Sequence, residues 1–201
     1  MALIFLLKGL ILGFSIAAPV GPIGILCIRR TLTQGLPSGF VSGLGAATAD
    51  GIYGCIAGFG LTIVANFLVA QQLWLHLLGG IFLLYLGFTT FNSRPAEKGA
   101  VIQESSLPKS YFSTLLLTIT NPLTILSFTA IFAGLGLGAA NTHYAGYLVL
   151  GVFLGSAFWW LILSSIVSFF RNSFNYQGLQ WINRFSGLVI AVFGLLALTK
   201  L

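Results

Sequence analysis

The sequence predicts an all-α polytopic membrane protein, and three features of its composition carry this prediction. Of the 201 residues, 57% are apolar and only 6% are charged, and the mean hydropathy is +1.01. A soluble domain carries about 25% charged residues to cover its water-facing surface, so this composition excludes an ordinary soluble protein and a disordered chain. The 25 glycines and 18 phenylalanines fit closely packed helices anchored by aromatic side chains, whereas the strands of a β-barrel alternate apolar and polar residues.

Six apolar stretches are long enough to cross a bilayer, which takes about 20 residues of helix. One hydrophilic connection, 92–110, divides them into two groups of three. We therefore expect a first three-helix repeat over 1–91, a cytoplasmic linker over 92–110 and a second three-helix repeat over 111–201. The predicted spans are 3–28, 38–65, 73–91, 111–137, 144–170 and 183–201.

Basic residues are distributed unequally between the two sides of these spans. Seven lie on one side and two on the other, and the positive-inside rule makes the richer side cytoplasmic. We expect the protein in the plasma (inner) membrane with both termini outside. The basic residues form no patch, so no nucleic-acid partner is expected despite the formal charge of +6. The richer side holds Arg29, Arg30, Arg94, Lys98, Lys109, Arg171 and Arg184, and the other holds Lys8 and Lys200.

The two halves of the chain resemble each other. Each has a proline in its first span and a Gly-x6-Gly pair in its third. Because three is an odd number, two such units in one chain sit in opposite orientations, which is the inverted-repeat plan of many secondary transporters. The expected fold is six transmembrane helices in two inverted repeats, with helices 1 and 4 broken at proline. The matching positions are 21–26 with 121–126, Gly80 with Gly187, and Gly87 with Gly194.

Two proline-containing interruptions are candidates for the lining of a site. The first contains Pro19, Gly21 and Pro22, and the second contains Asn121 and Pro122. A proline removes one amide donor and frees a carbonyl, which hydrocarbon tolerates only where protein or a water-filled cavity satisfies it. Two interruptions at matching repeat positions favour a substrate cavity over kinks that serve packing alone.

Asp50 is the only carboxylate inside a predicted span. An ionised Asp at the centre of a membrane helix costs roughly 2.5 to 3.5 kcal/mol on the insertion scale, so it must face the bundle interior. Three roles stay open for it: a proton carrier, a counter-charge for a substrate ammonium, or a structural acceptor. It shares a stripe with small residues that let a helix or a substrate approach closely. These are Gly39, Gly43, Ala46, Ala47, Gly54 and Gly58.

Other polar and aromatic side chains are weaker candidates. Thr118 lies on a stripe of span four that leads to Asn121, where its hydroxyl either lines a polar path or bonds its own helix. Tyr53, with Asn121 and the freed carbonyls, is where coupling would be sought if Asp50 only packs. Trp159 and Trp160 lie near the middle of span five, so they pack in the bundle or flank a cavity.

Enzyme signatures are absent from the sequence. It has no nucleotide-binding P-loop, paired carboxylates, metal-ligand cluster or Ser/His/Asp set. We therefore expect no enzyme and no cofactor, and an ion gradient is the remaining energy source.

The chain resembles the LysE/RhtB amino-acid exporters over essentially its whole length. The resemblance implies a plasma-membrane translocator that exports amino acids or similar small metabolites by proton antiport; a homodimer stays open as a further partner. Many members have a polar residue after the Gly-Pro pair, where this chain has Ile23 and Gly24, so the substrate stays open as well. The motifs that carry the resemblance are 18–24, 29–32 with Gly35, Gly39 and Gly43, 45–50, 121–122 and the two Gly-x6-Gly spans.

Three alternatives were weighed against amino-acid export. A cation (metal ion) exporter of the same superfamily suits a lone carboxylate and bare carbonyls, although the chain has no His, Met or Cys cluster for a soft metal. The related CcdA/DsbD thiol-electron transporters need symmetry-related cysteines, and here Cys27 matches Ser127 while Cys55 lies in span two. A passive membrane scaffold would need neither Asp50 nor paired helix breaks.

Overall fold

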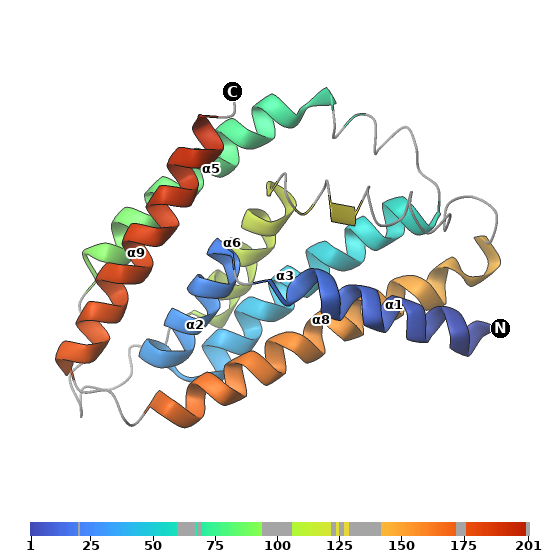
Figure 1. The fold of residues 1–201 in the computed structure, drawn as a ribbon, viewed down its shortest axis with the longest axis horizontal. Coiled ribbons are helices and arrows are strands. Elements are labelled where there is room, and N and C mark those ends of the chain that lie inside the picture. The colour runs from blue at the N-terminus through green and yellow to red at the C-terminus, as the bar shows by residue number, and fades with distance from the viewer. Residues whose placement is uncertain are drawn as a thin grey trace.

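The computed structural model describes residues 1–19, 21–59, 67, 70–93, 106–121, 124, 127–128, 142–171 and 176–199. In this part of the chain the regular structure is entirely helical, without a strand, which confirms the predicted all-α class (Figure 1). The helices are α1 (Ala2–Ala17), α2 (Pro22–Gln34), α3 (Leu36–Gly58), α5 (Gln72–Phe91), α6 (Leu107–Ile119), α8 (Thr142–Phe170) and α9 (Tyr176–Leu198).

Four of these helices are long and apolar enough to cross a membrane by themselves, namely α3, α5, α8 and α9. A fifth span results if α1 and α2 count as one, because together they meet the same criterion with a bend of 82° between them. The fourth predicted span, 111–137, is covered by α6 only as far as Ile119, and most of its remainder lies outside the described residues. The count of six spans therefore stays a prediction.

Several helix boundaries differ from the predicted spans. The helix that follows Pro22 continues through both arginines to Gln34, so Arg29 and Arg30 lie within α2 rather than in a loop. Gly35, with φ of 99°, then separates α2 from α3. A positive φ costs glycine little, which permits this abrupt change of direction. At the other end of the chain, α9 begins at Tyr176, before the predicted start at 183.

The helices pack in four principal pairings. Helix α1 lies along α8, α3 contacts both α8 and α6, and α5 lies along α9 (Figure 1). The short helix α2 contacts α3, α8 and α9, so it joins the α5–α9 pair to the remaining helices.

Glycines bring the paired helices into backbone contact. A Cβ atom on Gly13 of α1 would lie only 2.0 Å from the carbonyl oxygen of Val152 in α8. One on Gly87 of α5 would lie 2.8 Å from the carbonyl oxygen of Gly187 in α9. Close approach through small residues is how membrane helices gain packing contacts when water does not drive their association.

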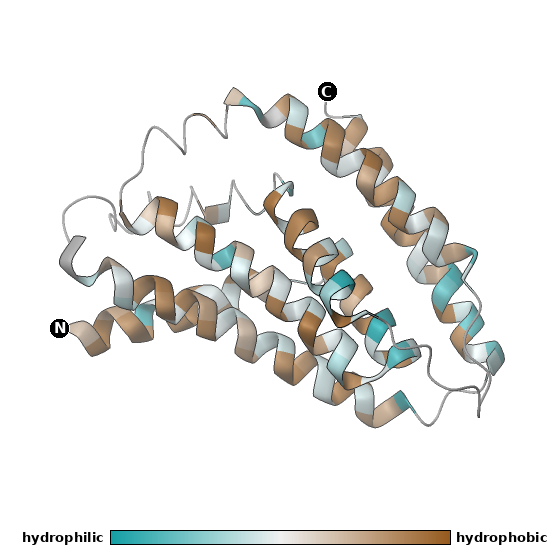
Figure 2. Ribbon diagram, turned by 180° about the vertical axis from the view of Figure 1, so that it is seen from behind, coloured by the Kyte–Doolittle hydropathy of each residue, from teal (hydrophilic) through white to brown (hydrophobic). Residues whose placement is uncertain are grey.

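The distribution of side chains is that of a protein surrounded by lipid. Large apolar residues face outward, as with Phe88, which is 70% exposed, and Phe169, which is 82% exposed. Polar side chains such as Ser42, Thr114 and Asn183 are buried between helices. Figure 2 shows hydrophobic residues along most of each helix, with hydrophilic residues gathered at one end of the bundle.

Candidate functional site

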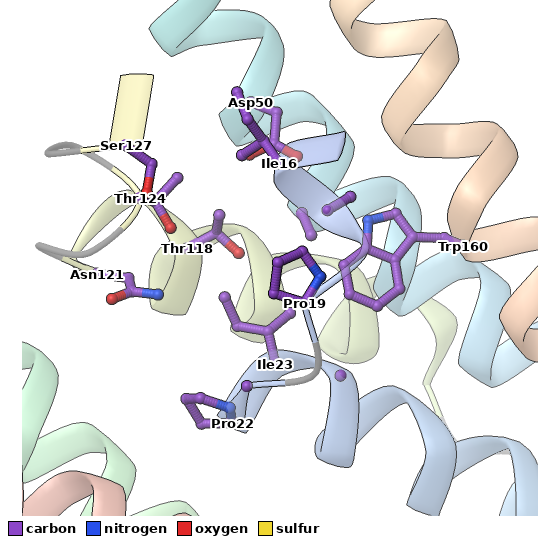
Figure 3. Close-up of a pocket in the computed structure, with 14 residues that line it drawn as sticks. Ile16, Pro19, Pro22, Ile23, Asp50, Thr118, Asn121, Thr124, Ser127 and Trp160 are labelled. Carbon is purple, nitrogen blue, oxygen red and sulfur yellow. The ribbon is translucent and has the colours of Figure 1, made fainter. Parts of the chain in front are cut away.

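One cavity of about 120 Å³ brings most of the predicted site residues together. Asp50 and Trp160 form part of its wall, and residues from both predicted helix interruptions form the rest (Figure 3). The predicted residues that line it are Pro19, Gly21, Pro22, Asp50, Thr118 and Asn121. The other lining residues are Ile16, Ala17, Ile23, Gly24, Ala46, Thr124, Ser127 and Trp160.

The two remaining predicted residues are placed differently. Pro122 lies outside the described residues. Tyr53 is buried but is not among the residues that line the cavity. Its hydroxyl donates a hydrogen bond to the carbonyl oxygen of Ile119, the last residue of α6. Carbonyls at a helix C-terminus lack intrahelical donors, so Tyr53 satisfies one of them and holds the end of α6 next to the cavity.

At the first interruption, the start of α2 borders the cavity. Gly21 is the N-cap residue of α2 and Pro22 occupies its first turn, where a missing amide proton costs nothing. No side chain caps this helix end. The first-turn amides have no intrahelical acceptor, and the helix dipole places a partial positive charge at this point. Because Ile23 and Gly24 also line the cavity, its wall includes a helix end suited to an anionic group.

At the second interruption, hydroxyl and amide groups contribute to the wall. The Thr118 hydroxyl donates to the carbonyl oxygen of Thr114 at 2.8 Å, within its own helix. Thr118 therefore lines the cavity while its hydroxyl proton is bonded within its own helix. After α6 the chain turns, with the amide of Asn121 donating to Thr118 and the amide of Thr124 donating to Asn121, both at 3.1 Å.

Asp50 is only 3% exposed and takes part in a hydrogen-bond chain that crosses between helices. Its Oδ2 atom accepts a bond from the Ser156 hydroxyl of α8 at 2.7 Å. The Ser156 oxygen accepts in turn from Trp160 Nε1 at 3.2 Å. The sequence analysis did not single out Ser156, although a serine in the middle of an apolar span, one helical turn before a tryptophan, was a signal that could have found it.

The two adjacent arginines of α2 form a second polar cluster. From the sequence they were expected to mark the cytoplasmic side and to belong to the 29–32 motif of the family resemblance. Arg30 is buried and donates from Nη1 to Ser42 Oγ, to Thr114 Oγ1 and to the carbonyl oxygen of Ser110, at 2.8 to 2.9 Å. Arg29 donates from Nε to Asn183 Oδ1 at 2.9 Å. Arg30 thus ties α2 to α3 and α6, and Arg29 ties it to α9.

Comparison with known proteins extends these observations. The family model of the LysE type translocator matches residues 14–201. The chain is 30% identical over 195 residues to the Bacillus subtilis (strain 168) protein named Putative amino acid efflux protein YcgF, covering 94% of this chain and 92% of that protein. It is 27% identical over 173 residues to the Escherichia coli (strain K12) protein named Uncharacterized membrane protein YahN, covering 84% of this chain and 77% of that protein. No solved structure matches significantly.

The family model covers nearly the whole chain, and its match begins before the first interruption and extends to the last residue. The apolar spanning helices described above agree with a multi-pass membrane protein. The chain therefore belongs to the LysE type translocators.

Proposed function

We propose that this protein is a secondary transporter that exports amino acids or related small metabolites across the plasma (inner) membrane by proton antiport. The observation that carries the proposal is the cavity in which Asp50, a buried carboxylate, meets residues of two helix interruptions. The name of the Bacillus subtilis relative, an amino acid efflux protein, agrees with this direction of transport.

The composition of the cavity wall suits a small zwitterion. Asp50 supplies a negative charge, and no Lys or Arg is among the described lining residues, so an ammonium group is the complementary partner. The start of α2 supplies amide donors and a partial positive charge for a carboxylate. Ile23, Pro19 and Trp160 provide apolar surface for a small side chain. A volume of about 120 Å³ restricts the solute to a small one in this conformation.

Coupling follows from competition at one carboxylate. Asp50 can be neutralised by a proton or by a substrate ammonium, and binding of one disfavours the other. If the carboxylate meets the two sides of the membrane alternately, each outward passage of substrate allows the inward passage of a proton. Burial among small residues makes this competition strong, because an uncompensated charge in the membrane interior is costly.

The packing of the helices supports two inverted repeats, 1–91 and 111–201. In the two repeats α1 corresponds to α6 and α3 corresponds to α8. The contact of α1 with α8 therefore corresponds to the contact of α6 with α3, and the structure has both contacts. They are alike in detail: a Cβ on Gly151 would lie 2.2 Å from the carbonyl oxygen of Leu6, and one on Gly45 would lie 2.3 Å from that of Tyr111.

The third spans of the two halves pair in the same reciprocal way. A Cβ on Gly80 would meet the carbonyl oxygen of Gly194, and one on Gly194 would meet that of Gly80. Gly87 and Gly187 make the equivalent contact. This pattern is what a two-fold axis between α5 and α9 produces, as expected for a six-span fold with broken helices 1 and 4.

The orientation proposed here places both termini outside. The arginine-bearing end of α2 lies at the hydrophilic end of the bundle, and Figure 1 shows both chain termini away from that end. The positive-inside rule makes the arginine-bearing end cytoplasmic. All described residues of the cavity wall come from one chain, so the proposal does not depend on a homodimer.

Transport by the purified protein in liposomes tests the proposal. Liposomes are loaded with a panel of labelled amino acids, or with a divalent metal ion in a parallel set, and a pH gradient is imposed. We expect the gradient to drive movement of some amino acids against their own concentration gradient, with counterflow of protons. Gradient-driven transport of the metal ion alone would favour the cation exporter, and transport indifferent to pH would exclude proton antiport.

A further inference from the structure

The hydrogen-bond chain from Trp160 through Ser156 to Asp50 has a fixed direction. An indole N–H can only donate, so the Ser156 oxygen is the acceptor of the 3.2 Å contact. A serine hydroxyl has one proton, and it points to Asp50 Oδ2 at 2.7 Å. All three side chains are buried, with Ser156 completely inaccessible. Water therefore does not compete for these contacts, and Oδ2 already serves as an acceptor.

We infer that Ser156 is a positioning residue that assigns different roles to the two oxygens of Asp50: Oδ2 is held as the permanent acceptor, and Oδ1 is the atom that takes the proton or the substrate ammonium. A proton on Oδ2 would place two hydrogens in one 2.7 Å contact. Protonation at Oδ1 keeps the chain intact, with Oδ2 as the carbonyl oxygen of the acid. The inference deepens the proposed function, since it concerns the same carboxylate.

Ser156 occupies the position in the second half of the chain that corresponds to Asp50 in the first half. Gly45 of α3 contacts Tyr111 of α6, and Gly151 of α8 makes the corresponding contact with Leu6 of α1. Gly45 and Gly151 are therefore equivalent positions in the two halves, 106 residues apart. The same offset relates Asp50 to Ser156. The carboxylate is thus oriented by its own counterpart in the other half of the chain.

Other titratable or charged groups on the surrounding helices are engaged elsewhere. On α3, Tyr53 donates to Ile119. On α2, Arg30 donates to groups on α3 and α6, and Cys27 is a buried free thiol. Among the described lining residues, α1, α6 and α8 contribute no charged side chain to the cavity. Ser156 is therefore the donor through which the orientation of Asp50 is controlled.

Infrared difference spectroscopy of the purified protein in liposomes tests this assignment without any transported solute. The C=O stretching band of the protonated Asp50 carboxyl is identified by titrating pH and by its loss in Asp50→Asn. In the native protein Oδ2 is the carbonyl oxygen and accepts from Ser156, which lowers the stretching frequency. We expect Ser156→Ala to move the band to higher frequency. Trp160→Phe, which removes the donor to Ser156, should give a smaller shift in the same direction because hydrogen bonds in a chain strengthen one another.

Ser164→Ala is the matched control. Ser164 is also a buried serine of α8, but its hydroxyl has no hydrogen-bond partner among the described residues, so its removal should leave the band unmoved. A band at the native frequency in both Ser156→Ala and Trp160→Phe would overturn the inference, as would the lack of any Asp50-dependent band. Failure of transport with the expected band shifts would instead count against the proposed function alone.

Discussion

At the scale of single residues, Asp50 is the proposed carrier of coupling. Asn at this position preserves the shape of the side chain and its bond from Ser156, but it can neither hold a negative charge nor exchange a proton. We expect Asp50→Asn to reduce uphill efflux to the level of empty liposomes while membrane insertion is retained. Downhill exchange should continue at reduced affinity, because the neutral amide oxygen can still accept a hydrogen bond from a substrate ammonium but no longer offers a charge. Transport of labelled amino acids with and without a pH gradient measures both activities.

The cysteines provide the controls for this variant. Cys27 and Cys55 are free thiols with no role in the proposed mechanism, so Cys27→Ser and Cys55→Ser should remain active. A fully coupled, pH-sensitive Asp50→Asn transporter would reduce Asp50 to a packing residue. The search for coupling would then move to Asn121, Tyr53 and the freed carbonyls.

Arg30 has a structural role that its substitution should reveal. Its guanidinium bonds to groups on two other helices, and Arg30→Met leaves Ser42, Ser110 and Thr114 without this donor. We expect a loss of stability on the order of 3 kcal/mol, since each unsatisfied buried group costs about 1 to 3 kcal/mol. Thermal unfolding in detergent measures the change.

The comparison for Arg30→Met is Arg184→Met on α9. Arg184 is exposed and lies 6.0 Å from the ring of Trp181. Removal of an exposed charge usually changes stability by less than about 0.5 kcal/mol. Equal melting temperatures for the two variants would show that the Arg30 contacts contribute nothing to the fold.

Sequence reasoning found some of these residues and missed others for a physical reason. A carboxylate in an apolar span is conspicuous because its burial is costly, so Asp50 could be singled out from composition alone. Ser156 is one hydroxyl among many, and its importance depends on a contact between residues 106 positions apart. The roles of Arg29 and Arg30 likewise depend on acceptors from distant helices.

At the scale of helices, backbone contact at glycine is the feature most sensitive to substitution. A Cβ on Gly13 would lie 2.0 Å from the Val152 carbonyl, so Gly13→Ala must push α1 away from α8. Overpacking of this kind costs typically about 1 to 3 kcal/mol. We expect a lower melting temperature and a lower yield of monodisperse protein for Gly13→Ala.

Gly146 is the matched glycine on α8. An added Cβ there meets nothing within 4 Å. Since Ala is a better helix former than Gly by up to about 1 kcal/mol, Gly146→Ala should be neutral or stabilising. If both variants melted at the same temperature, the α1–α8 contact would not be as tight as described.

The positions of the helices could be predicted from the sequence more fully than the pairs in which the helices pack. Long apolar runs predicted α5, α8 and α9, and the prolines predicted a break in the first helix near residues 19–22. The sequence could not show that α1 packs on α8 or α5 on α9, because apolar faces of membrane helices are chemically alike. The first predicted span ended at residue 28, but the sequence also allowed the half-helix after Pro22 to continue past the two arginines toward Gln34, and α2 does so. Hydroxyls and carbonyls of other helices accept hydrogen bonds from Arg30 there.

At the scale of the whole molecule, the symmetric pattern of contacts links fold to transport. The two halves meet along α1–α8, α3–α6, α3–α8 and α5–α9, and the cavity lies among residues of both halves. In the proposed transport mechanism, a rotation of one half relative to the other opens this cavity first to one side of the membrane and then to the other. The reciprocal glycine contacts of α5 and α9 make that pair a suitable axis.

The orientation of the molecule decides which end of the bundle faces the cytoplasm, and it can be measured directly. In a background with Cys27→Ser and Cys55→Ser, single cysteines are placed at Lys109, near the start of α6, and at Ala2, at the start of α1. The excess of basic residues beside Lys109 predicts a cytoplasmic position, and Ala2 is then outside. An impermeant thiol reagent applied to intact cells should label Ala2→Cys at once and Lys109→Cys only after permeabilisation. Labelling of Lys109→Cys in intact cells would reverse the topology, and the arginine-bearing end of α2 would then face outward.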